Sequence, residues 1–162
     1  MAREKSPVTP AIRELRAAKV LFSEHLYQYE EKGGTAVSAR ELGVDEHAVV
    51  KTLIMEDERK NPLVVLMHGD CQVSTKELAR IMGVKQVSPC SPEVANRHSG
   101  YLVGGTSPFG MKKRLPVYME ESIRALPRIY LNGGKRGFLV GLEPAEVVRL
   151  LNPIMVRVGL SG

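Results

Sequence analysis

Residues 49–68 read VVKTLIMEDERKNPLVVLMH, and this stretch sets the expected fold. The runs VVKTLIME (49–56) and PLVVLMH (62–68) are rich in aliphatic and β-branched residues, as strands buried in a sheet are. Lys51 interrupts the first run, and a lysine is rarely buried without a partner because its ammonium group is costly to desolvate. Lys51 therefore either extends its charge into solvent or aims it into a cleft, beside the Thr52 hydroxyl.

Further strands and short helices complete the pattern. FSEHLYQY (22–29) alternates, and IYLN (129–132) and FLVGL (138–142) flank the glycine-rich turn GGKRG. Helix starts are predicted at Thr9-Pro10, Ser91-Pro92, Glu143-Pro144, Ser38-x-x-Glu41 and Ser74-x-x-Glu77. Since short helices interrupt the strands without regular β-α-β spacing, we expect an α/β fold. Its mixed, mainly antiparallel sheet or small barrel would be wrapped by short helices.

Length and composition are those of a globular domain. With 162 residues, 43% hydrophobic and 25% charged, the chain can bury a sizeable core. We expect one domain over residues 1–162, with 155–162 as a loose tail. No apolar run approaches the roughly 18 residues that span a bilayer, so we expect no membrane association. Nothing in the sequence demands a dimer, and a monomer is expected.

The cysteines indicate a reducing compartment. Cys71 and Cys90 lie far apart without CxxC spacing, which is typical of free thiols in a cytoplasmic protein. His68 and Cys71 have H-x-x-C spacing, but no second ligand pair follows, whereas a structural zinc site takes four ligands. We therefore expect neither a metal nor a cofactor.

The positive charge is concentrated in one segment. Twenty-three Lys and Arg against eighteen Asp and Glu give the chain a net charge of +5. Residues 111–136 hold seven of these cations and only two acids, Glu120 and Glu121, so the rest of the chain is neutral. Such a segment is typical of a surface that faces a polyanion, although a solvated face would carry the same charge.

The stretch GYLVGGTSPFGMKKRLP (100–116) joins a double glycine to a basic run and contains no His, Asp, Glu or Cys. It matches neither a P-loop nor the dinucleotide-binding fingerprint. Gly104 and Gly105 can turn consecutive backbone N–H groups toward an anion or a carbonyl oxygen, and Pro108 would fix the far side of the loop. An ordinary turn accounts for the same residues.

Three motifs in this order resemble the YbaK/EbsC-type aminoacyl-tRNA deacylases, which are related to the editing domain of bacterial prolyl-tRNA synthetases. The motifs are Val50-Lys51-Thr52-Leu53, the whole of 100–116, and IYLNGGKRG at 129–137. Their order and spacing hold along almost the whole chain. Within the family the sequence looks most like the YbaK branch, which deacylates cysteinyl-tRNA(Pro).

The resemblance implies roles for individual residues. The family's lysine and threonine fall on Lys51 and Thr52, and its tyrosine falls on Tyr27, with Tyr29 close by. Catalytic roles are implied for Lys51, Gly104 and Gly105, and substrate contacts for Tyr27, Thr52, Thr106, Ser107, Pro108 and Asn132. Contacts with tRNA are implied for Lys112, Lys113, Arg114, Lys135 and Arg136.

Two positions depart from the family pattern. Asn132 stands where the family has a serine, and Leu139 stands where close relatives have an aspartate. Asn132 can still form hydrogen bonds, whereas Leu139 cannot. The departures bear on the polar side of the pocket and on the choice of amino acid.

The chemistry implied by the family needs no protein nucleophile. In YbaK-type enzymes the thiol of the cysteinyl group attacks its own ester carbonyl, which releases tRNA and a thiolactone. The enzyme has to fold the substrate back and stabilise the oxyanion, a task for backbone N–H groups near Gly104 and Gly105. Lys51 would hold or orient the substrate and, as an ordinarily protonated side chain, would not be a general base. The implied partners are the acceptor end of tRNA(Pro) and prolyl-tRNA synthetase.

Two alternatives stay open. A sister branch of the family clears alanyl-tRNA(Pro), where no substrate thiol exists and water must attack. A non-catalytic tRNA-binding module would use the basic segment alone. Its affinity would fall as salt rises, and it would release no amino acid.

Overall fold

The centre of the fold is an antiparallel pair of long strands formed by the stretch 49–68. In the computed structural model, which describes residues 6–161, β2 (Val50–Asp57) pairs with β3 (Pro62–His68) along its length. The Asp57 carboxylate accepts hydrogen bonds from the N–H groups of Arg59 and Asn61 at 2.8 and 3.0 Å, which fixes the connecting turn. Both predicted strands are confirmed.

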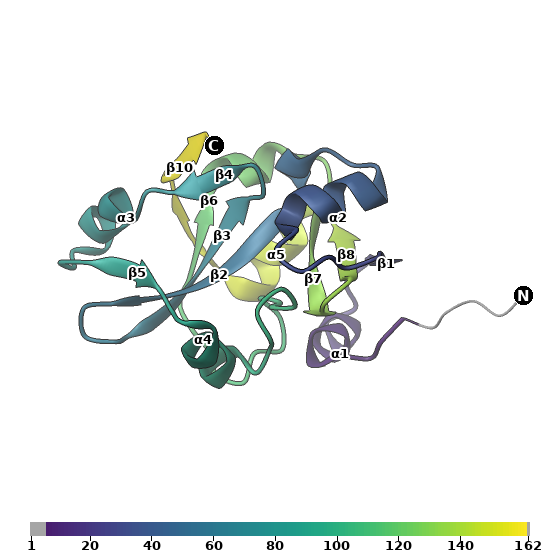
Figure 1. Cartoon of the computed structure of the whole chain (residues 1–162), viewed down its shortest axis with the longest axis horizontal. Helices are drawn as coiled ribbons and strands as arrows, with labels where there is room; N and C mark the ends of the chain where they lie inside the picture. The colour runs from purple at the N-terminus through teal and green to yellow at the C-terminus, as the bar shows by residue number, and fades with distance from the viewer. Residues whose placement is uncertain (1–5, 162) are drawn as a thin grey trace, which may run out of the picture.

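Three sheets share the chain (Figure 1). The largest has the strand order β5-β2-β3-β6-β9, the second has β1-β8-β7, and β10 pairs with β4. These other strands are β1 (Ser23–Leu26), β4 (Cys71–Val73), β5 (Val87–Pro89), β6 (Val117–Glu120), β7 (Ile129–Lys135), β8 (Phe138–Leu142), β9 (Ile154–Val156) and β10 (Gly159–Ser161). Strands β3, β6 and β9 pair in parallel, and the remaining pairs are antiparallel. The mixed, mainly antiparallel arrangement is confirmed, and over residues 6–161 the strands do not close into a barrel.

Short helices lie on both sides of the sheets. They are α1 (Pro10–Ala17), α2 (Gly34–Leu42), α3 (Thr75–Met82), α4 (Pro92–Ser99) and α5 (Pro144–Leu151), with single 3₁₀ turns η1 (Glu46–Ala48) and η2 (Glu121–Ala125). The hydroxyls of Thr9, Ser74 and Ser91 accept a hydrogen bond from the first turn of α1, α3 and α4, so these starts are confirmed. In the part of the chain that the structure describes, no helix has the length and apolar character needed to cross a membrane.

Two other helix starts behave differently. α5 begins at the predicted Glu143-Pro144, but without a side-chain cap. The start predicted at Ser38 is wrong, because α2 begins at Gly34 and Ser38 lies inside the helix. The Ser38 hydroxyl donates to the Thr35 carbonyl oxygen at 3.1 Å. Serine can bond the backbone in this way within a helix as well as at its start, so the four-residue pattern alone did not locate the boundary.

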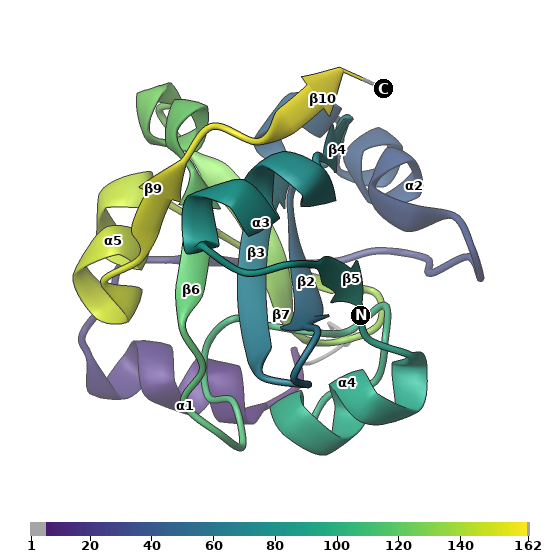
Figure 2. The ribbon, with the colours of Figure 1, turned by 90° about the vertical axis from the view of Figure 1, so that its left-hand side faces the viewer.

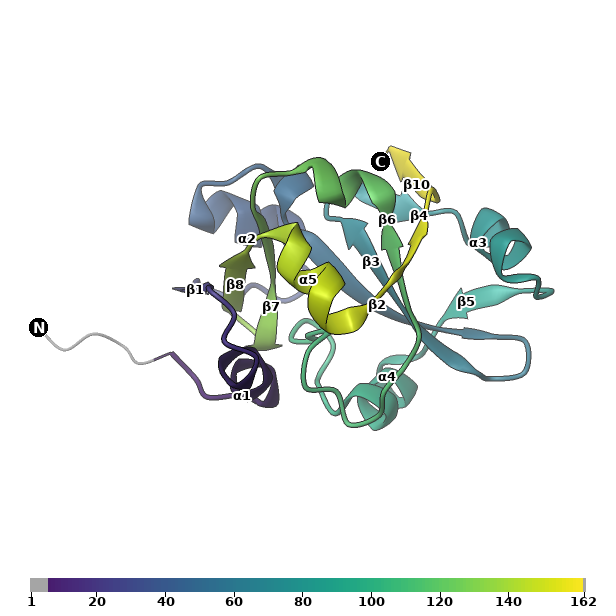
Figure 3. The ribbon, with the colours of Figure 1, turned by 180° about the vertical axis from the view of Figure 1, so that it is seen from behind.

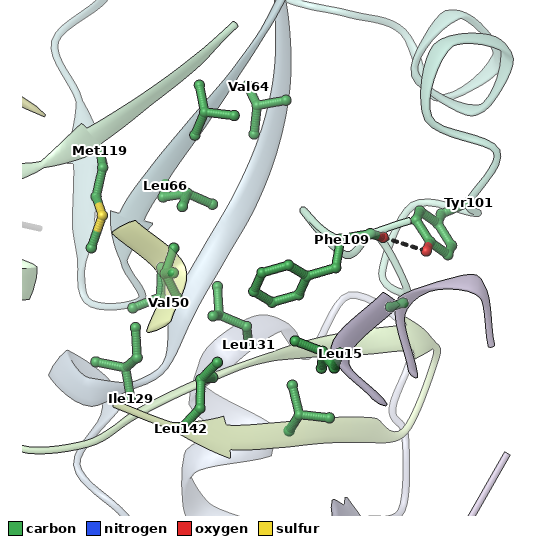
Figure 4. Packing of buried hydrophobic residues seen from close by; sticks show 14 of the residues in the cluster. Leu15, Val50, Val64, Leu66, Tyr101, Phe109, Met119, Ile129, Leu131 and Leu142 are labelled. Atoms are coloured by element: carbon green, nitrogen blue, oxygen red, sulfur yellow. Dashed lines mark hydrogen bonds between the residues drawn. The ribbon is translucent and has the colours of Figure 1, made fainter. Parts of the chain in front are cut away.

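The helices on the two sides cover different apolar clusters. α1, α4 and α5 pack into the largest cluster, which contains Phe109 and Leu66 (Figure 4). α3 packs on the opposite side, in a cluster with Met67. Since Leu66 and Met67 are successive residues of β3, the strand is buried on both faces. α2 covers a small third cluster that contains Val49 and Leu139. Figure 3 shows α1 and α5 together on one side of the molecule.

The C-terminal segment is part of the sheets. β9 pairs with β6, and β10 crosses to β4 above α3 (Figure 2). The Glu120 carboxylate accepts the N–H groups of Val158 and Gly159 at 2.7 and 3.1 Å. The loose tail expected over 155–162 is therefore wrong for residues 155–161, and residue 162 lies outside the described residues. Strands of three residues are too short to show a period, which is why the sequence did not reveal them.

Candidate active site

The loop of residues 102–109, called the glycine loop below, is pressed against the β7–β8 hairpin. Gly104 has a φ of +91°, in the left-handed region, and a Cβ there would lie 2.8 Å from the Tyr29 hydroxyl oxygen. A Cβ on Gly105 would lie 2.8 Å from the backbone nitrogen of Arg136, and backbone cannot swing aside as a flexible side chain can. The first glycine is required by its φ and the second by the close approach of two backbones.

Asn132 ties the glycine loop to β7. Its side-chain nitrogen donates to the Gly104 carbonyl oxygen at 3.0 Å, and its side-chain oxygen accepts from the N–H groups of Gly134 and Lys135 at 2.7 and 3.1 Å. These bonds hold the irregular end of β7, where the pairing with β8 shifts register after Asn132. Both the nitrogen and the oxygen of the Asn132 side chain are therefore hydrogen-bonded within the protein. Contact between Asn132 and substrate stays a prediction.

Arg136 fixes the same loop from the hairpin turn. Its Nε donates to the Val103 carbonyl oxygen at 2.9 Å, and its guanidinium carbon lies 5.4 Å from the centre of the Tyr29 ring. Tyr29, the second choice for the family's tyrosine, is thus the tyrosine that touches the glycine loop. The sequence could not separate it from Tyr27, because residues two apart on an extended chain point the same way. Contact between Arg136 and tRNA stays a prediction.

The hydroxyl groups of the glycine loop are used inside the loop. Thr106 and Ser107 are buried, as is Pro108. The Thr106 hydroxyl donates to the Leu102 carbonyl oxygen at 3.4 Å, and the Ser107 hydroxyl oxygen accepts the Phe109 N–H at 3.2 Å. These residues shape the loop, and the substrate contacts predicted for them are untested.

The two glycine N–H groups differ. The Gly105 N–H donates to the Leu102 carbonyl oxygen at 2.8 Å and is therefore engaged. Gly104 is exposed, and among the hydrogen bonds of residues 6–161 none involves its N–H. Of the two N–H groups, that of Gly104 is therefore the one left open to an external acceptor, while Gly105 shapes the turn that presents it.

Lys51 and Thr52 are neighbours on β2 that point to opposite sides of the sheet. Thr52 stands between Val50 and Ile54 of the largest apolar cluster, and its hydroxyl oxygen is buried without a hydrogen-bond partner among the described residues. Lys51 is half-buried and lies on the other side, close enough to Cys71 for its charge to act on that thiol. Lys51 and Thr52, expected side by side in a cleft, thus point to opposite sides of the strand, and the substrate contact of Thr52 stays a prediction.

The start of β2 lies beside β7, the strand that carries the anchor of the glycine loop. An isolated parallel bridge joins Val49 to Tyr130. Two residues further along each strand stand Lys51 on β2 and Asn132 on β7, and residues two apart on a strand point the same way. Asn132 binds Gly104, so the bridge places the start of β2, with Lys51 two residues further on, next to the strand that holds the loop anchor.

An apolar wall borders this region. Leu139 lies opposite Asn132 in the β7–β8 pairing and packs with Ala39 of α2 and Val49, and Tyr27 packs against them. Burial raises the pKa of the Tyr27 phenol, so its hydroxyl stays neutral at physiological pH. Leu139, at the position where the family resemblance implies an aspartate, is thus buried among apolar side chains in this chain.

A groove of about 450 Å³ opens beside the hairpin. Leu26 and Tyr27 line one side, and residues 135–138 line the other. Neither Lys51 nor Gly104 lines it, so the groove lies next to the glycine loop and does not include it. It joins Tyr27 to two residues of the predicted tRNA contact, Lys135 and Arg136.

The cations of residues 111–136 fall into two groups. Lys112, Lys113 and Arg114 are exposed, and within residues 6–161 none of the ion pairs involves them. Arg128 instead donates to the Gly141 carbonyl oxygen at 2.9 Å and lies over the Tyr130 ring. Part of the positive charge therefore serves the fold, whereas Lys112–Arg114 are exposed without an ion pair among the described residues, as are Arg124 and Lys135. Contact of Lys112–Arg114 and Lys135 with tRNA stays a prediction.

The H-x-x-C pair of the sequence is not a unit in the structure. His68 is buried, with Nδ1 2.7 Å from the His47 carbonyl oxygen and Nε2 2.6 Å from the Ser122 hydroxyl oxygen. Both of its ring nitrogens are therefore engaged away from Cys71. The histidine that comes close to Cys71 is His47.

Comparison with known proteins identifies the family to which the chain belongs. Residues 30–150 match the family model of the aminoacyl-tRNA editing domain. The chain is 32% identical over 154 residues to an Enterococcus faecalis protein named "Putative Cys-tRNA(Pro)/Cys-tRNA(Cys) deacylase EbsC", and the match covers 94% of each chain. The chain therefore belongs to the aminoacyl-tRNA editing domain family, and the resemblance seen in its motifs is confirmed.

Further relatives agree with this assignment. A proline–tRNA ligase of Thermodesulfovibrio yellowstonii is 35% identical over 89 residues, which is 55% of this chain but only 15% of the ligase. A solved structure described as "a putative trans-editing enzyme for prolyl tRNA synthetase" has a TM-score of 0.81 at 20% identity, covering 96% of this chain and 99% of that one. A hypothetical protein superimposes with a TM-score of 0.86 at 21% identity, over 94% and 100% of the two chains. The shared mixed α/β fold is the one predicted.

Proposed function

We propose that this protein deacylates cysteinyl-tRNA(Pro), the product of mischarging, in trans. The observation that carries the proposal is the exposed Gly104 N–H on a loop clamped by Asn132 and Arg136. A fixed backbone donor of this kind is suited to an oxyanion and is worth about 100- to 1000-fold in rate. The name of the Enterococcus faecalis relative supports cysteine as the amino acid removed.

The proposed reaction uses the nucleophile of the substrate. The cysteinyl thiol loses its proton and attacks the ester carbonyl, so that a C–S bond forms and the carbonyl oxygen becomes an oxyanion. Collapse of the oxyanion breaks the C–O bond to the terminal ribose, whose oxygen takes up a proton. The products are uncharged tRNA and a cysteine thiolactone. Gly104 would stabilise the oxyanion, and the wall of Tyr27 and Leu139 would help to hold the side chain folded back toward the carbonyl.

Lys51 would position the acceptor end. It is a half-buried cation two residues past the bridge that joins Val49 to Tyr130 of β7, the strand of the loop anchor Asn132. A cation there suits the phosphate or ribose of the terminal adenosine. Its loss would misplace the ester relative to Gly104 and so lower turnover more than binding.

The body of the tRNA would meet the exposed Lys112–Arg114 segment, which follows the glycine loop directly. Phosphate contacts position a nucleic acid but carry little sequence information. Recognition of tRNA(Pro) would therefore need a partner, and prolyl-tRNA synthetase is the partner we propose. We also propose that the protein acts as a monomer. The match to proline–tRNA ligases supports this choice.

The second candidate is removal of alanine from tRNA(Pro). Leu139 favours it, because Leu139 packs with Val49 and Ala39 in an apolar cluster at the position where the family resemblance implies an aspartate. Alanine carries no thiol, so a water molecule would have to attack in the same oxyanion site. A non-catalytic tRNA-binding module is the third reading and depends on the basic residues alone.

Release of amino acid from tRNA(Pro) charged with cysteine, serine or alanine tests these readings. Rapid loss of cysteine only, reduced at least 100-fold by Lys51→Ala, is the expected result. Lys60→Ala is the matched control, because Lys60 is an exposed lysine at the distal β2–β3 turn, paired with Glu56 at 3.1 Å. Loss of alanine would transfer the protein to the second candidate. Binding without release of any of the three would leave the tRNA-binding module.

A further inference from the structure

We propose that His47, Asp70 and Cys71 form a binding site for one Zn²⁺ ion. Their ligand atoms lie within 4.8 Å of one another. His47 Nδ1 is 2.8 Å from Asp70 Oδ1, and Cys71 Sγ is 3.6 Å from the same oxygen. Tetrahedral Zn²⁺, with bonds of about 2.0–2.3 Å, places its ligand atoms roughly 3.3–3.8 Å apart. Small side-chain rotations would therefore open the cluster around an ion.

The ligands come from two segments that the backbone already holds together. His47 lies in η1, where the Asp45 carboxylate accepts the His47 N–H at 2.9 Å. Asp70 and Cys71 lie at the β3–β4 turn. The Gly69 N–H donates to the Val49 carbonyl oxygen at 2.6 Å, which joins the turn to the end of η1. An ion would bind between segments whose spacing is set without it.

His68 supports the first ligand from behind. Its ring stacks on that of His47, with ring centres 3.6 Å apart and planes 7° from parallel. Its Nδ1 donates to the His47 carbonyl oxygen at 2.7 Å, since a carbonyl oxygen can only accept. The stacked ring limits rotation of the His47 side chain, and the hydrogen bond holds its backbone. The buried histidine that the H-x-x-C spacing suggested as a ligand is thus a positioning residue for the ligand His47.

The donor set selects the metal. Nitrogen and sulfur ligands with one carboxylate suit Zn²⁺, whereas Ca²⁺ and Mg²⁺ prefer oxygen alone. The side chains of His47 and Asp70 are 40% and 42% exposed, so an ion can enter from solvent and keep water as its fourth ligand. Binding would release the Cys71 thiol proton to solvent and leave a thiolate on the metal.

Titration of the chelator-treated full-length protein with Co²⁺, followed by displacement with Zn²⁺, tests the site. We expect one Co²⁺ per chain and a thiolate-to-cobalt charge-transfer band that Zn²⁺ abolishes. Cys71→Ser should remove the band, and His47→Gln should weaken binding at least 10-fold. Cys90→Ser is the matched control and should keep the band, because Cys90 also lies beside a carboxylate, with Sγ 3.7 Å from Glu56 Oε2, but is not part of such a cluster.

Thermal unfolding gives a second readout that needs no thiolate band. Zn²⁺ at about 100 times its Kd should raise the Tm of the wild type by roughly 5–10 °C, and should leave the Tm of Cys71→Ser unchanged. The absence of a charge-transfer band in the wild type would overturn the proposal, as would a band that survives Cys71→Ser. Neither readout depends on deacylase activity, so the site can fail or stand independently of the proposed function.

Discussion

The glycine loop and the Lys112–Arg114 segment are adjacent in sequence but differ in how firmly the rest of the protein holds them. The loop is held by side-chain bonds from Asn132 and Arg136, and its own hydroxyls are buried. The three cations that follow are exposed and form no ion pair within residues 6–161. The glycine loop is thus fixed by hydrogen bonds, whereas Lys112–Arg114 contribute exposed positive charge.

This difference matches two kinds of task. Stabilising an oxyanion requires a donor at a fixed position, because a shift of about 1 Å can cost 100-fold in rate. Attracting phosphates requires positive charge that can adapt to a backbone, and contributes mainly to affinity. Changes in the two segments should therefore alter different kinetic constants, and the predictions below separate them.

The largest effect is expected for Gly105→Ala. The new Cβ would lie 2.8 Å from the backbone nitrogen of Arg136, so the loop would have to move away from the hairpin. Because that movement displaces the Gly104 N–H, we expect a loss of kcat of about 100-fold or more, with KM changed by less than about 3-fold. Single-turnover deacylation at a series of enzyme concentrations measures both the maximal rate constant and the half-saturating concentration, and so separates the two.

Gly43→Ala serves as its control. Gly43 ends α2 with a φ of +70° and has open space around its Cβ position. Its replacement should cost about 1 kcal/mol of stability through the backbone conformation alone and leave kcat intact. If both alanine variants lost activity equally, the loss in Gly105→Ala would reflect lower overall stability and not a displaced Gly104 N–H.

A smaller effect, on a different constant, is expected from neutralising the basic residues. Replacing Lys112, Lys113 and Arg114 together by alanine should raise KM about 10-fold at moderate salt and change kcat little. The slope of log affinity against log salt should fall by about 2–3, since each phosphate contact contributes roughly 0.7–0.9. Filter binding of tRNA at several salt concentrations gives the slope. A large loss of kcat with an unchanged slope would contradict the division of labour between the two segments.

Much of this comparison could be read from the sequence. The capping residues Thr9, Ser74 and Ser91 and the strands around Lys51 are local signals, because neighbouring residues decide them. The double glycine and the basic run were likewise visible as a motif. Their assignment to one family rested on motif order, which the comparisons confirm.

What could not be predicted depends on contacts between distant segments. Asn132 and Gly104 are 28 residues apart, and only the fold brings the amide to the loop carbonyl. Thr52 was assigned to the site beside Lys51, yet alternation on β2 turns it toward the core. The short strands β9 and β10 carry no period of their own and are fixed by partners far away in sequence, β6 and β4.

The smallest effect on activity is expected for Tyr101→Phe, which tests how the loop is anchored at its ends. The buried Tyr101 hydroxyl donates to the Phe109 carbonyl oxygen at 2.6 Å, so one bond closes the loop across eight residues (Figure 4). Removing it should lower the free energy of unfolding by about 1–3 kcal/mol, because the carbonyl loses its partner, and should lower kcat less than about 3-fold.

Burial raises the pKa of Tyr101 to about 12. The stability that favours the neutral phenol is therefore present below the ordinary tyrosine pKa of about 10 and is lost as the pH rises toward 12. Urea unfolding between pH 8 and pH 11 should show a steeper alkaline decline for the wild type than for Tyr101→Phe. Tyr118→Phe, in the cluster on the other side of the sheet, should leave the wild-type decline in place. Equal declines in the wild type and Tyr101→Phe would mean that the loop is held by Asn132 and Arg136 alone.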